Sequence, residues 1–286
     1  MDEMKKIVLV ASGGLANRMR AVASGLTLSQ DTGAPLSIIW YRDWGLNALP
    51  EQLFCHSQWM DMITVPGSLE YNLKWELPRK KNFYISRLYQ YANFGDIIID
   101  DVEPMTRLRD NKDAFRRLVI DAQKDIYIFS GIPFYDFETE FYRSLFIPTE
   151  EIQKRVDAIT SSFIENTVGI HIRRTDNLMS RKYSPTSLFI EETDRLLTFR
   201  PNTLFYLASD DEEVKNEFRD RYGSNIIVSS LSSDRGSAQG IKDAFTELLV
   251  LSRCRLLIGS WWSSYSMSAP LLGNVELKQL RINDCK

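Results

Sequence analysis

Residues 167–176 read Thr-Val-Gly-Ile-His-Ile-Arg-Arg-Thr-Asp, and this stretch decides the predicted fold. Its first part alternates apolar side chains with Gly169 and His171, a period of two that predicts a β-strand. The apolar run stops at Arg173 and Arg174, and ligands of open α/β sheets bind at the carboxyl ends of strands. Two guanidinium groups there suit a multiply charged anion such as a diphosphate. Taken alone, the stretch is equally compatible with a strand that ends in solvated charges.

The composition is that of a globular protein, with 286 residues, 44% hydrophobic and 26% charged. This length allows two domains of ordinary size. A net charge of −3 argues against a nucleic-acid-binding surface, which is normally basic, so any anion site must be local. The three cysteines form no Cys-x-x-Cys pair, so neither a zinc site nor a disulfide framework is predicted. Without a signal sequence or a membrane-helix run, we expect a cytoplasmic protein, and peripheral membrane contact stays compatible with the sequence.

The N-terminal half begins with the pattern of a Rossmann-like unit. Residues 7–11 predict a buried strand, residues 12–14 a tight turn, and Leu15, Met19, Val22 and Leu26 one face of a helix. The turn is not Gly-x-Gly-x-x-Gly, so no nicotinamide or flavin dinucleotide is predicted. Asn17, Arg18 and Arg20 lie on the first turns of this helix, where exposed N–H groups favour anions or hydroxyl ligands. Further predictions are strands at 35–40, 97–99 and 126–129, a helix within 110–122, and loops with short helices over 44–95.

The C-terminal half predicts a second unit of the same kind. Thr149 is expected to cap a helix that leads into the strand at 168–172, which places the domain boundary between residues 147 and 148. Alternating strands and helices with short loops predict a parallel, doubly wound α/β sheet in each of the domains 1–147 and 148–286. The remaining predictions are strands at 203–209, 225–228 and 256–259, helices after 211, over 241–252 and after 264, and a polar loop at 229–240 that could close over a ligand.

Polar side chains recur at the carboxyl ends of these strands. Asp210-Asp211 and the stretch 260–264 follow two strands, and Glu247 lies among apolar residues on the helix between them. An Asp pair or Ser263-Ser264 alone is usually a helix cap, but several such features at one sheet edge favour a site. Because neither Asp-x-Asp nor a Gly-x-x-x-x-Gly-Lys loop is present, we predict a nucleotide diphosphate held without a metal. Arginine would neutralise it, and hydroxyl and N–H groups at Ser263 and Ser264 would share its charge.

Four of these segments resemble motifs of the fucosyltransferase superfamily, which covers α-1,2, α-1,6 and protein O-fucosyltransferases. Residues 13–19, Gly-Gly-Leu-Ala-Asn-Arg-Met, resemble the Gly-Gly-Leu-Gly-Asn-Gln-Met of bacterial α-1,2 enzymes. Residues 171–176 resemble the His-Val-Arg-Arg-Thr-Asp of α-1,6 enzymes, and residues 206–211 and 251–264 resemble two later motifs. The resemblance spans residues 7–32 and 165–272, whereas residues 44–148 carry none.

The resemblance implies an inverting transferase of two facing Rossmann-like domains, the GT-B arrangement, that uses GDP-fucose and no cofactor. The domain 148–286 would bind the nucleotide sugar, and the domain 1–147 would lie on the side of an oligosaccharide or glycolipid acceptor. Arg173 would contact the β-phosphate, His171 the nucleotide, and Glu247 the guanine edge. The residues assigned to the nucleotide sugar are His171, Arg173, Arg174, Asp210, Asp211, Glu247, Ser263 and Ser264, and those assigned to the acceptor side are Gly14, Asn17 and Arg18.

The general base is the weak point of this assignment, because Arg181 occupies the position where α-1,6 enzymes carry a Glu. Asp176 is the nearest carboxylate in the sequence. As in the protein O-fucosyltransferases, we expect Arg173 and Asn17 to act as the catalytic pair, with Asp176 orienting the arginines. Arg174, which points to the other face of the strand, would fix Asp176 or a neighbouring loop.

Two alternatives stay open at this stage: a transferase that uses another nucleotide sugar, and a catalytically idle protein that binds a nucleotide sugar or glycan. The residues that select the acceptor would lie in 44–148 and in a loop at 177–187.

Overall fold

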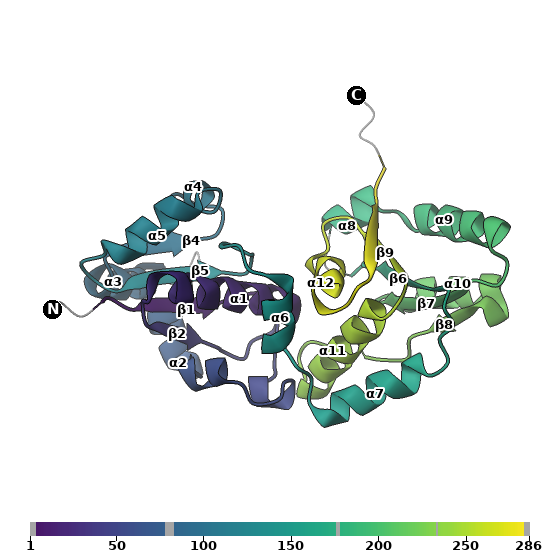
Figure 1. Cartoon of the computed structure of the whole chain (residues 1–286), viewed down its shortest axis with the longest axis horizontal. Coiled ribbons are helices and arrows are strands. Elements are labelled where there is room, and N and C mark those ends of the chain that lie inside the picture. The colour runs from purple at the N-terminus through teal and green to yellow at the C-terminus, as the bar shows by residue number, and fades with distance from the viewer. Residues whose placement is uncertain (1–3, 78–82, 176–177, 233, 283–286) are drawn as a thin grey trace. The chain divides into compact units, whose positions relative to one another are not determined.

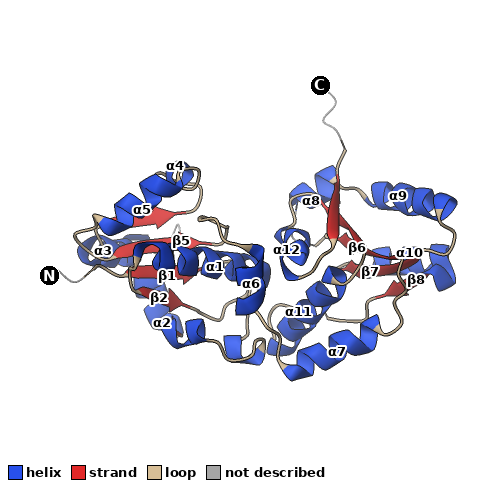
Figure 2. Cartoon of the chain, in the orientation of Figure 1, coloured by secondary structure: helices blue, strands red, loops and turns tan. Residues whose placement is uncertain are grey.

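The structure is a computed structural model of the chain, and it describes residues 4–77, 83–175, 178–232 and 234–282. The chain forms two compact units, Met1–Ile147 and Pro148–Lys286. Each unit is built on a parallel five-stranded sheet with helices packed against it (Figures 1 and 2). This architecture confirms the predicted α/β class with two Rossmann-like sheets.

Unit 1 has the strand order β3-β2-β1-β5-β4, so the first strand of the chain lies at the centre of its sheet. Every residue of β1 is buried, which agrees with its uninterrupted apolar sequence. The next helix ends at Gly33, whose φ of 75° is the left-handed conformation that favours glycine. The strands are β1 (Ile7–Ala11), β2 (Leu36–Ile39), β3 (Ile63–Thr64), β4 (Asp96–Ile99) and β5 (Ile126–Ser130), and the helices are α1 (Leu15–Thr32), α2 (Ser68–Glu70), α3 (Phe83–Asn93), α4 (Met105–Leu108), α5 (Lys112–Ile120) and α6 (Thr139–Leu145), with short turns η1 (Pro50–Gln52), η2 (Gln58–Met62) and η3 (Tyr71–Trp75).

Unit 2 has the strand order β10-β9-β6-β7-β8, which places the stretch that opened the sequence analysis at the centre of the sheet. Its strands are β6 (Thr167–Ile172), β7 (Leu204–Ser209), β8 (Ile226–Val228), β9 (Leu256–Ser260) and β10 (Glu276–Leu280). Its helices are α7 (Glu150–Thr160), α8 (Leu178–Tyr183), α9 (Thr186–Phe199), α10 (Glu212–Tyr222), α11 (Ala238–Ser252) and α12 (Ser264–Leu272), with a turn η4 (Gly223–Asn225).

The two faces of β6 have different tasks. Val168, Ile170 and Ile172 enter the apolar core of unit 2 together with Phe189 and Phe205. The alternate residues face the other side, where a Cβ atom at Gly169 would come within 3.0 Å of Leu251 on α11. His171 belongs to this second set, so it lies on the side of the sheet covered by α11 and α12.

Some elements were not predicted. The predicted loop at 177–187 contains α8, the region 44–95, predicted as loops with short helices, also contains the strand β3 and the longer helix α3, and α6, α9 and β10 were not anticipated. Helix α7 begins at Glu150 with Thr149 at its N-cap position, as predicted, although the Thr149 hydroxyl makes no capping hydrogen bond.

Candidate functional site

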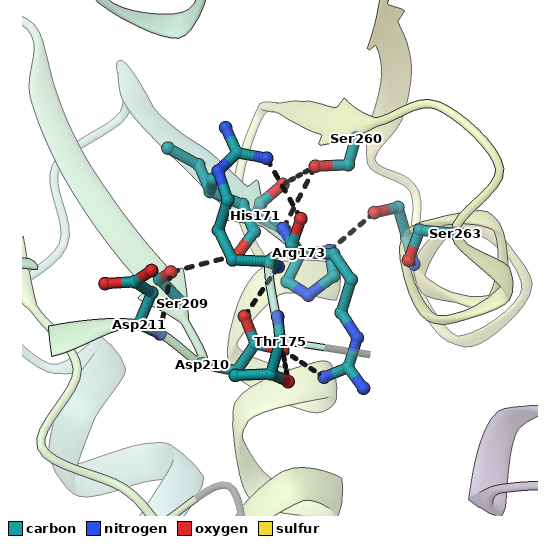
Figure 3. Close-up of polar contacts among 11 residues, drawn as sticks. His171, Arg173, Thr175, Ser209, Asp210, Asp211, Ser260 and Ser263 are labelled. Atoms are coloured by element: carbon teal, nitrogen blue, oxygen red, sulfur yellow. Dashed lines mark hydrogen bonds and ion pairs between the residues drawn. The ribbon is translucent and has the colours of Figure 1, made fainter. Parts of the chain in front are cut away.

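The carboxyl ends of β6, β7 and β9 bring together an arginine, an aspartate and a serine (Figure 3). The Arg173 backbone N–H donates to the Ser260 hydroxyl at 3.0 Å. The Arg173 guanidinium pairs with the Asp210 carboxylate, with 2.6 Å between Nη1 and Oδ2, and both side chains are largely buried. Residues 87 and 37 positions apart are joined in this way because neighbouring parallel strands end at the same edge.

Asp210 organises the segment that follows β6. Its carboxylate accepts hydrogen bonds from the Arg174 N–H at 2.7 Å and from the Thr175 hydroxyl at 2.6 Å, in addition to the ion pair with Arg173. Burial opposes its ionisation, but Arg173 and these hydrogen bonds outweigh burial and hold the pKa of Asp210 below its ordinary value. Asp210 therefore carries a negative charge that fixes Arg173 in place.

Arg174 points away from this pair. Its Nε and Nη2 atoms lie 3.3 and 3.0 Å from the Thr186 hydroxyl at the start of α9, and Nη1 donates to the Arg173 carbonyl at 3.0 Å. Its guanidinium carbon lies 5.9 Å from the Phe189 ring. Arg174 thus fixes the end of β6 to the start of α9, which agrees with the predicted task of fixing Asp176 or a neighbouring loop. Its contact with a nucleotide stays a prediction.

His171 links the same edge to the start of α12. Its Nδ1 atom lies 2.7 Å from the Ser266 hydroxyl, and its ring centroid lies 4.8 Å from that of Tyr265. Burial and the nearby Arg173 lower the pKa of His171 to about 3, so the ring is neutral at physiological pH. Ser263 caps α12 by accepting from the Ser266 N–H at 3.5 Å, which leaves the first N–H groups of this helix at the strand edge.

Glu247 is a partly buried carboxyl group on α11. The hydroxyl groups of Ser229 and Tyr265 lie within hydrogen-bonding reach of it. Burial raises the pKa of Glu247 to about 7. The Tyr206 hydroxyl, which is electrostatically coupled to Glu247, is buried and has no hydrogen-bond partner among the described residues. Glu247 and these three hydroxyl groups form a polar set that includes Tyr265 in the first turn of α12.

The other predicted residues of unit 2 lie at the starts of helices, on α8, or outside the described residues. Asp211 caps α10 by accepting from the N–H groups of Glu213 and Val214 at 2.9 and 3.2 Å, so it has a structural task, and its binding role stays a prediction. Ser264 is the first residue of α12. Asp176, predicted to orient the arginines, lies outside the described residues. Arg181 is exposed on α8.

In unit 1, the acceptor-side role predicted for Arg18 is wrong. Its side chain is fully buried, and its guanidinium donates to the carbonyls of Gly13 and Tyr41 and to the Asp43 carboxylate, at 2.9 Å in the last case. It also packs over the rings of Trp40 and Tyr41. A guanidinium held in this way shapes the loop after β2 and is inaccessible to a substrate.

Asn17 and Gly14 remain at the carboxyl edge of the unit 1 sheet. Gly14 precedes α1, and the side-chain amide oxygen Oδ1 of Asn17 accepts from the Arg20 guanidinium at 2.9 Å. Gly13 adopts a φ of 78°, and a Cβ atom there would lie 2.6 Å from Asn17 Nδ2, so the turn requires glycine. Asn17 is therefore placed beside the end of β1 by the local backbone, and its acceptor-side role stays a prediction.

Several residues were missed. The serine-rich sequence 263–268 could have pointed to Ser266, and the position of Asp100 after β4 could have pointed to a carboxylate at the unit 1 edge. One Asp100 oxygen accepts from the Gly131 N–H at 2.6 Å, the other is buried without a hydrogen-bond partner among the described residues, and burial raises the pKa of Asp100. No signal in the sequence marks Thr186.

A cavity of about 320 Å³ lies between the end of α9 and the amino ends of β6 and β9, away from Arg173 and Glu247. Among the residues that the structure describes, no three His, Cys, Asp or Glu side chains are grouped to hold a metal ion. None of the described helices is long and apolar enough to cross a membrane.

The fold of the chain matches solved structures of GT-B fucosyltransferases over nearly its full length. The fucosyltransferase NodZ from Bradyrhizobium matches with a TM-score of 0.63 and 18% identity, covering 96% of each chain. A mutant of Arabidopsis thaliana FUT1 in complex with GDP matches with a TM-score of 0.62 and 15% identity, covering 99% of this chain and 71% of the other. POFUT1 in complex with GDP-fucose matches with a TM-score of 0.55 and 11% identity, covering 99% of each chain.

At these identities the likeness concerns the fold. No protein-family model matches the sequence, and no curated protein matches it.

Proposed function

We propose that the chain is an inverting glycosyltransferase that transfers fucose from GDP-fucose to a hydroxyl group of an oligosaccharide or glycolipid. The observation that carries this proposal is the Arg173–Asp210 ion pair, held at the carboxyl edge of the unit 2 sheet beside the start of α12. Two of the solved structures that share the fold, NodZ and POFUT1, contain or were soaked with GDP-fucose. Unit 2 is the proposed donor-binding domain, and unit 1 is the proposed acceptor-side domain.

The reaction breaks the bond between fucose C1 and the β-phosphate oxygen, so GDP leaves with additional negative charge. The acceptor oxygen attacks C1 from the opposite face, which inverts the configuration, and its proton passes to solvent or to a base. Arg173 and the first N–H groups of α12 would stabilise the departing diphosphate, as preorganised donors do for a developing anion. In this arrangement the guanidinium fork supplies the positive charge that a metal supplies in other transferases.

Catalysis would depend more on leaving-group stabilisation than on a base. Arg181 stands where a Glu base was expected, and it is exposed on α8. We therefore assign catalysis to Arg173 and Asn17 and give Asp176 an orienting role. His171, neutral and buried, would hold the nucleotide by hydrogen bonding and packing without adding charge.

Glu247 is the proposed reader of the guanine edge. A carboxylate accepts two parallel hydrogen bonds from guanine N1–H and N2–H₂, a pattern that uracil and adenine do not present. The neighbouring Ser229 and Tyr265 hydroxyls provide further polar groups around it. This residue alone distinguishes a GDP-sugar donor from other nucleotide sugars in the proposal.

Thermal shift with GDP, UDP, ADP and dTDP tests the donor class, because a ligand that binds only the folded state stabilises it by RT ln(1 + [L]/Kd), so at equal concentration the tightest nucleotide raises Tm most. We expect GDP to give the largest shift. A larger shift with another nucleotide would favour a transferase with a different donor. Release of GDP from GDP-fucose, in the presence of acceptor glycans or of water alone, separates an enzyme from an idle binding protein, which would bind GDP-fucose by calorimetry and leave it intact.

A further inference from the structure

Helix α3 (Phe83–Asn93) in unit 1 exposes large apolar and aromatic side chains to solvent. Its inward side consists of Ser86 and Gln90, which are almost completely buried, and of Tyr89, which packs against the unit 1 core. We call the exposed side chains the α3 face: Tyr84, Ile85, Leu88 and Tyr91, which are 69%, 54%, 68% and 64% exposed.

The α3 face is continuous along the helix. At 100° per residue, its four members fall within an arc of about 120°, which is the width of an apolar stripe that normally faces a protein core. Single exposed apolar residues are common on protein surfaces, but a cluster of this kind marks a contact surface. Leu69 on α2, which contacts η3 as α3 does, is also strongly exposed.

The inward face fixes this orientation. The Gln90 side-chain amide donates to the carbonyls of Lys74 and Glu76 at 3.3 and 3.4 Å. The Tyr89 ring packs against Trp75, with 5.5 Å between ring centroids. Rotation of the helix to bury the α3 face would break the hydrogen bonds of a buried amide, which is costly. The outward apolar face is therefore a stable property of unit 1.

The charge of this region is positive in a chain whose net charge is −3. Helix α3 carries Arg87 and contains no Asp or Glu. Arg87 is on α3 itself, with its guanidinium carbon 5.3 Å from the Tyr91 ring. Apolar side chains next to cations match a surface that offers both hydrocarbon and phosphate.

We propose that the α3 face docks on the surface of an anionic phospholipid bilayer. Tyrosine is favoured at the boundary between hydrocarbon and water, where its ring is buried and its hydroxyl stays hydrated. A helix of 11 residues is too short to span a bilayer, so it would lie in the plane of the interface with Ile85 and Leu88 inserted. Arg87 on the same helix adds attraction to anionic headgroups. The inference does not depend on the proposed transferase activity.

Co-sedimentation with vesicles tests the proposal in the full chain. Vesicles of phosphatidylcholine alone would be compared with vesicles that contain about 30% phosphatidylglycerol, whose negative surface attracts basic segments. We expect stronger binding to the anionic vesicles, reduced when the salt concentration is raised from about 0.1 M to about 0.5 M. Leu88→Ser should lower the partition coefficient about tenfold, and Arg87→Gln about fivefold at low salt.

Phe199→Ser is the matched control, because Phe199 is 73% exposed but lies on α9 in unit 2. It should bind vesicles like the wild type. All altered side chains are exposed or half-buried, so circular dichroism and Tm should show folded variants. Absence of vesicle binding, or equal binding by wild type and Leu88→Ser, would overturn the proposal. A dimer that Leu88→Ser dissociates, without vesicle binding, would also overturn it and assign the α3 face to a second copy of the chain.

Discussion

The affinity for GDP should depend on pH through Glu247. Burial raises the pKa of this carboxyl group from 4.5 to about 7, so it gains a proton as the pH falls through 7. Only the carboxylate accepts both guanine N–H groups, and protonation replaces one acceptor by a donor. With this pKa the ionised fraction is about nine tenths at pH 8 and about one tenth at pH 6. The dissociation constant of GDP should therefore rise about tenfold when the pH is lowered from 8 to 6.

Glu247→Gln is the perturbation that isolates this effect. Glutamine has nearly the same shape but cannot ionise, and the loss of a charged hydrogen-bond acceptor should weaken GDP binding at pH 8 by roughly 10- to 100-fold. Calorimetric titration with GDP at about pH 6 and pH 8, in both proteins, is the assay. The terminal phosphate of GDP titrates in the same range, but both proteins share that contribution. His171, with a pKa of about 3, stays neutral throughout, and Asp210, with a lowered pKa, stays ionised.

The same substitution should change the stability of the unliganded protein in the opposite sense. The folded-state pKa is raised, so the protonated form is favoured on folding, and this stabilisation is lost as the pH rises from 4.5 through 7. At pH 8 the variant should be more stable than the wild type by on the order of 2 kcal/mol, reduced from the full shift because the residue is partly accessible. Urea unfolding at both pH values measures this. Equal pH dependence of GDP affinity in the two proteins would refute the role assigned to Glu247.

Three further substitutions separate catalytic, capping and structural tasks. Arg173→Ala should lower the rate of fucose transfer at least about a hundredfold, because one lost donor to a developing anion raises the barrier by roughly 3–4 kcal/mol. Arg173→Lys keeps the charge and should recover part of that loss. Near-normal turnover in the alanine variant would exclude the leaving-group role. Asp211→Ala should destabilise the fold by about 1 kcal/mol, because Asp211 caps α10, and it should also weaken GDP binding in calorimetry if the predicted ligand contact exists; unchanged GDP affinity would leave Asp211 the cap alone. Arg18→Met should cost at least about 3 kcal/mol in urea unfolding, because it removes the ion pair with Asp43 and leaves the carbonyls of Gly13 and Tyr41 without their donor, whereas Arg143→Met, at a more exposed position, should cost little.

The parts of the structure that the sequence predicted are those set by local pattern and by a simple rule of topology. The alternation in residues 167–172 identifies β6, and the rule that parallel strands end at one edge predicts that residues after β6, β7 and β9 meet. Arg173, Asp210 and Ser260 do meet there. This rule does not predict which side chains form ion pairs, so the pairing of Asp210 with Arg173 is known only from the structure.

The failures have physical causes as well. The three acceptors of Arg18 lie up to 25 residues away, and no local pattern distinguishes a buried arginine from one that awaits a substrate. The bounds of α3, within a region predicted as loops with short helices, were not found because several of its apolar residues face solvent, whereas periodicity is interpreted on the assumption that they face a core. Strand β10 contributes an edge strand of alternating polar and apolar residues to the sheet, and its short polar sequence resembles a loop.

The ion pair between Arg173 and Asp210 gives the proposed donor site its order before any ligand arrives. An arginine on the surface loses about 2 kcal/mol of side-chain entropy when a ligand immobilises it, and that cost reduces the affinity. In this protein most of that entropy is already lost on folding, because Arg173 Nη1 lies 2.6 Å from the Asp210 carboxylate and the Arg173 backbone N–H donates to the Ser260 hydroxyl at 3.0 Å. A guanidinium can form several charged hydrogen bonds at once, so pairing with a carboxylate does not prevent it from binding a phosphate. The negative charge of Asp210 also limits how tightly the site retains GDP, which favours release of the leaving group after transfer.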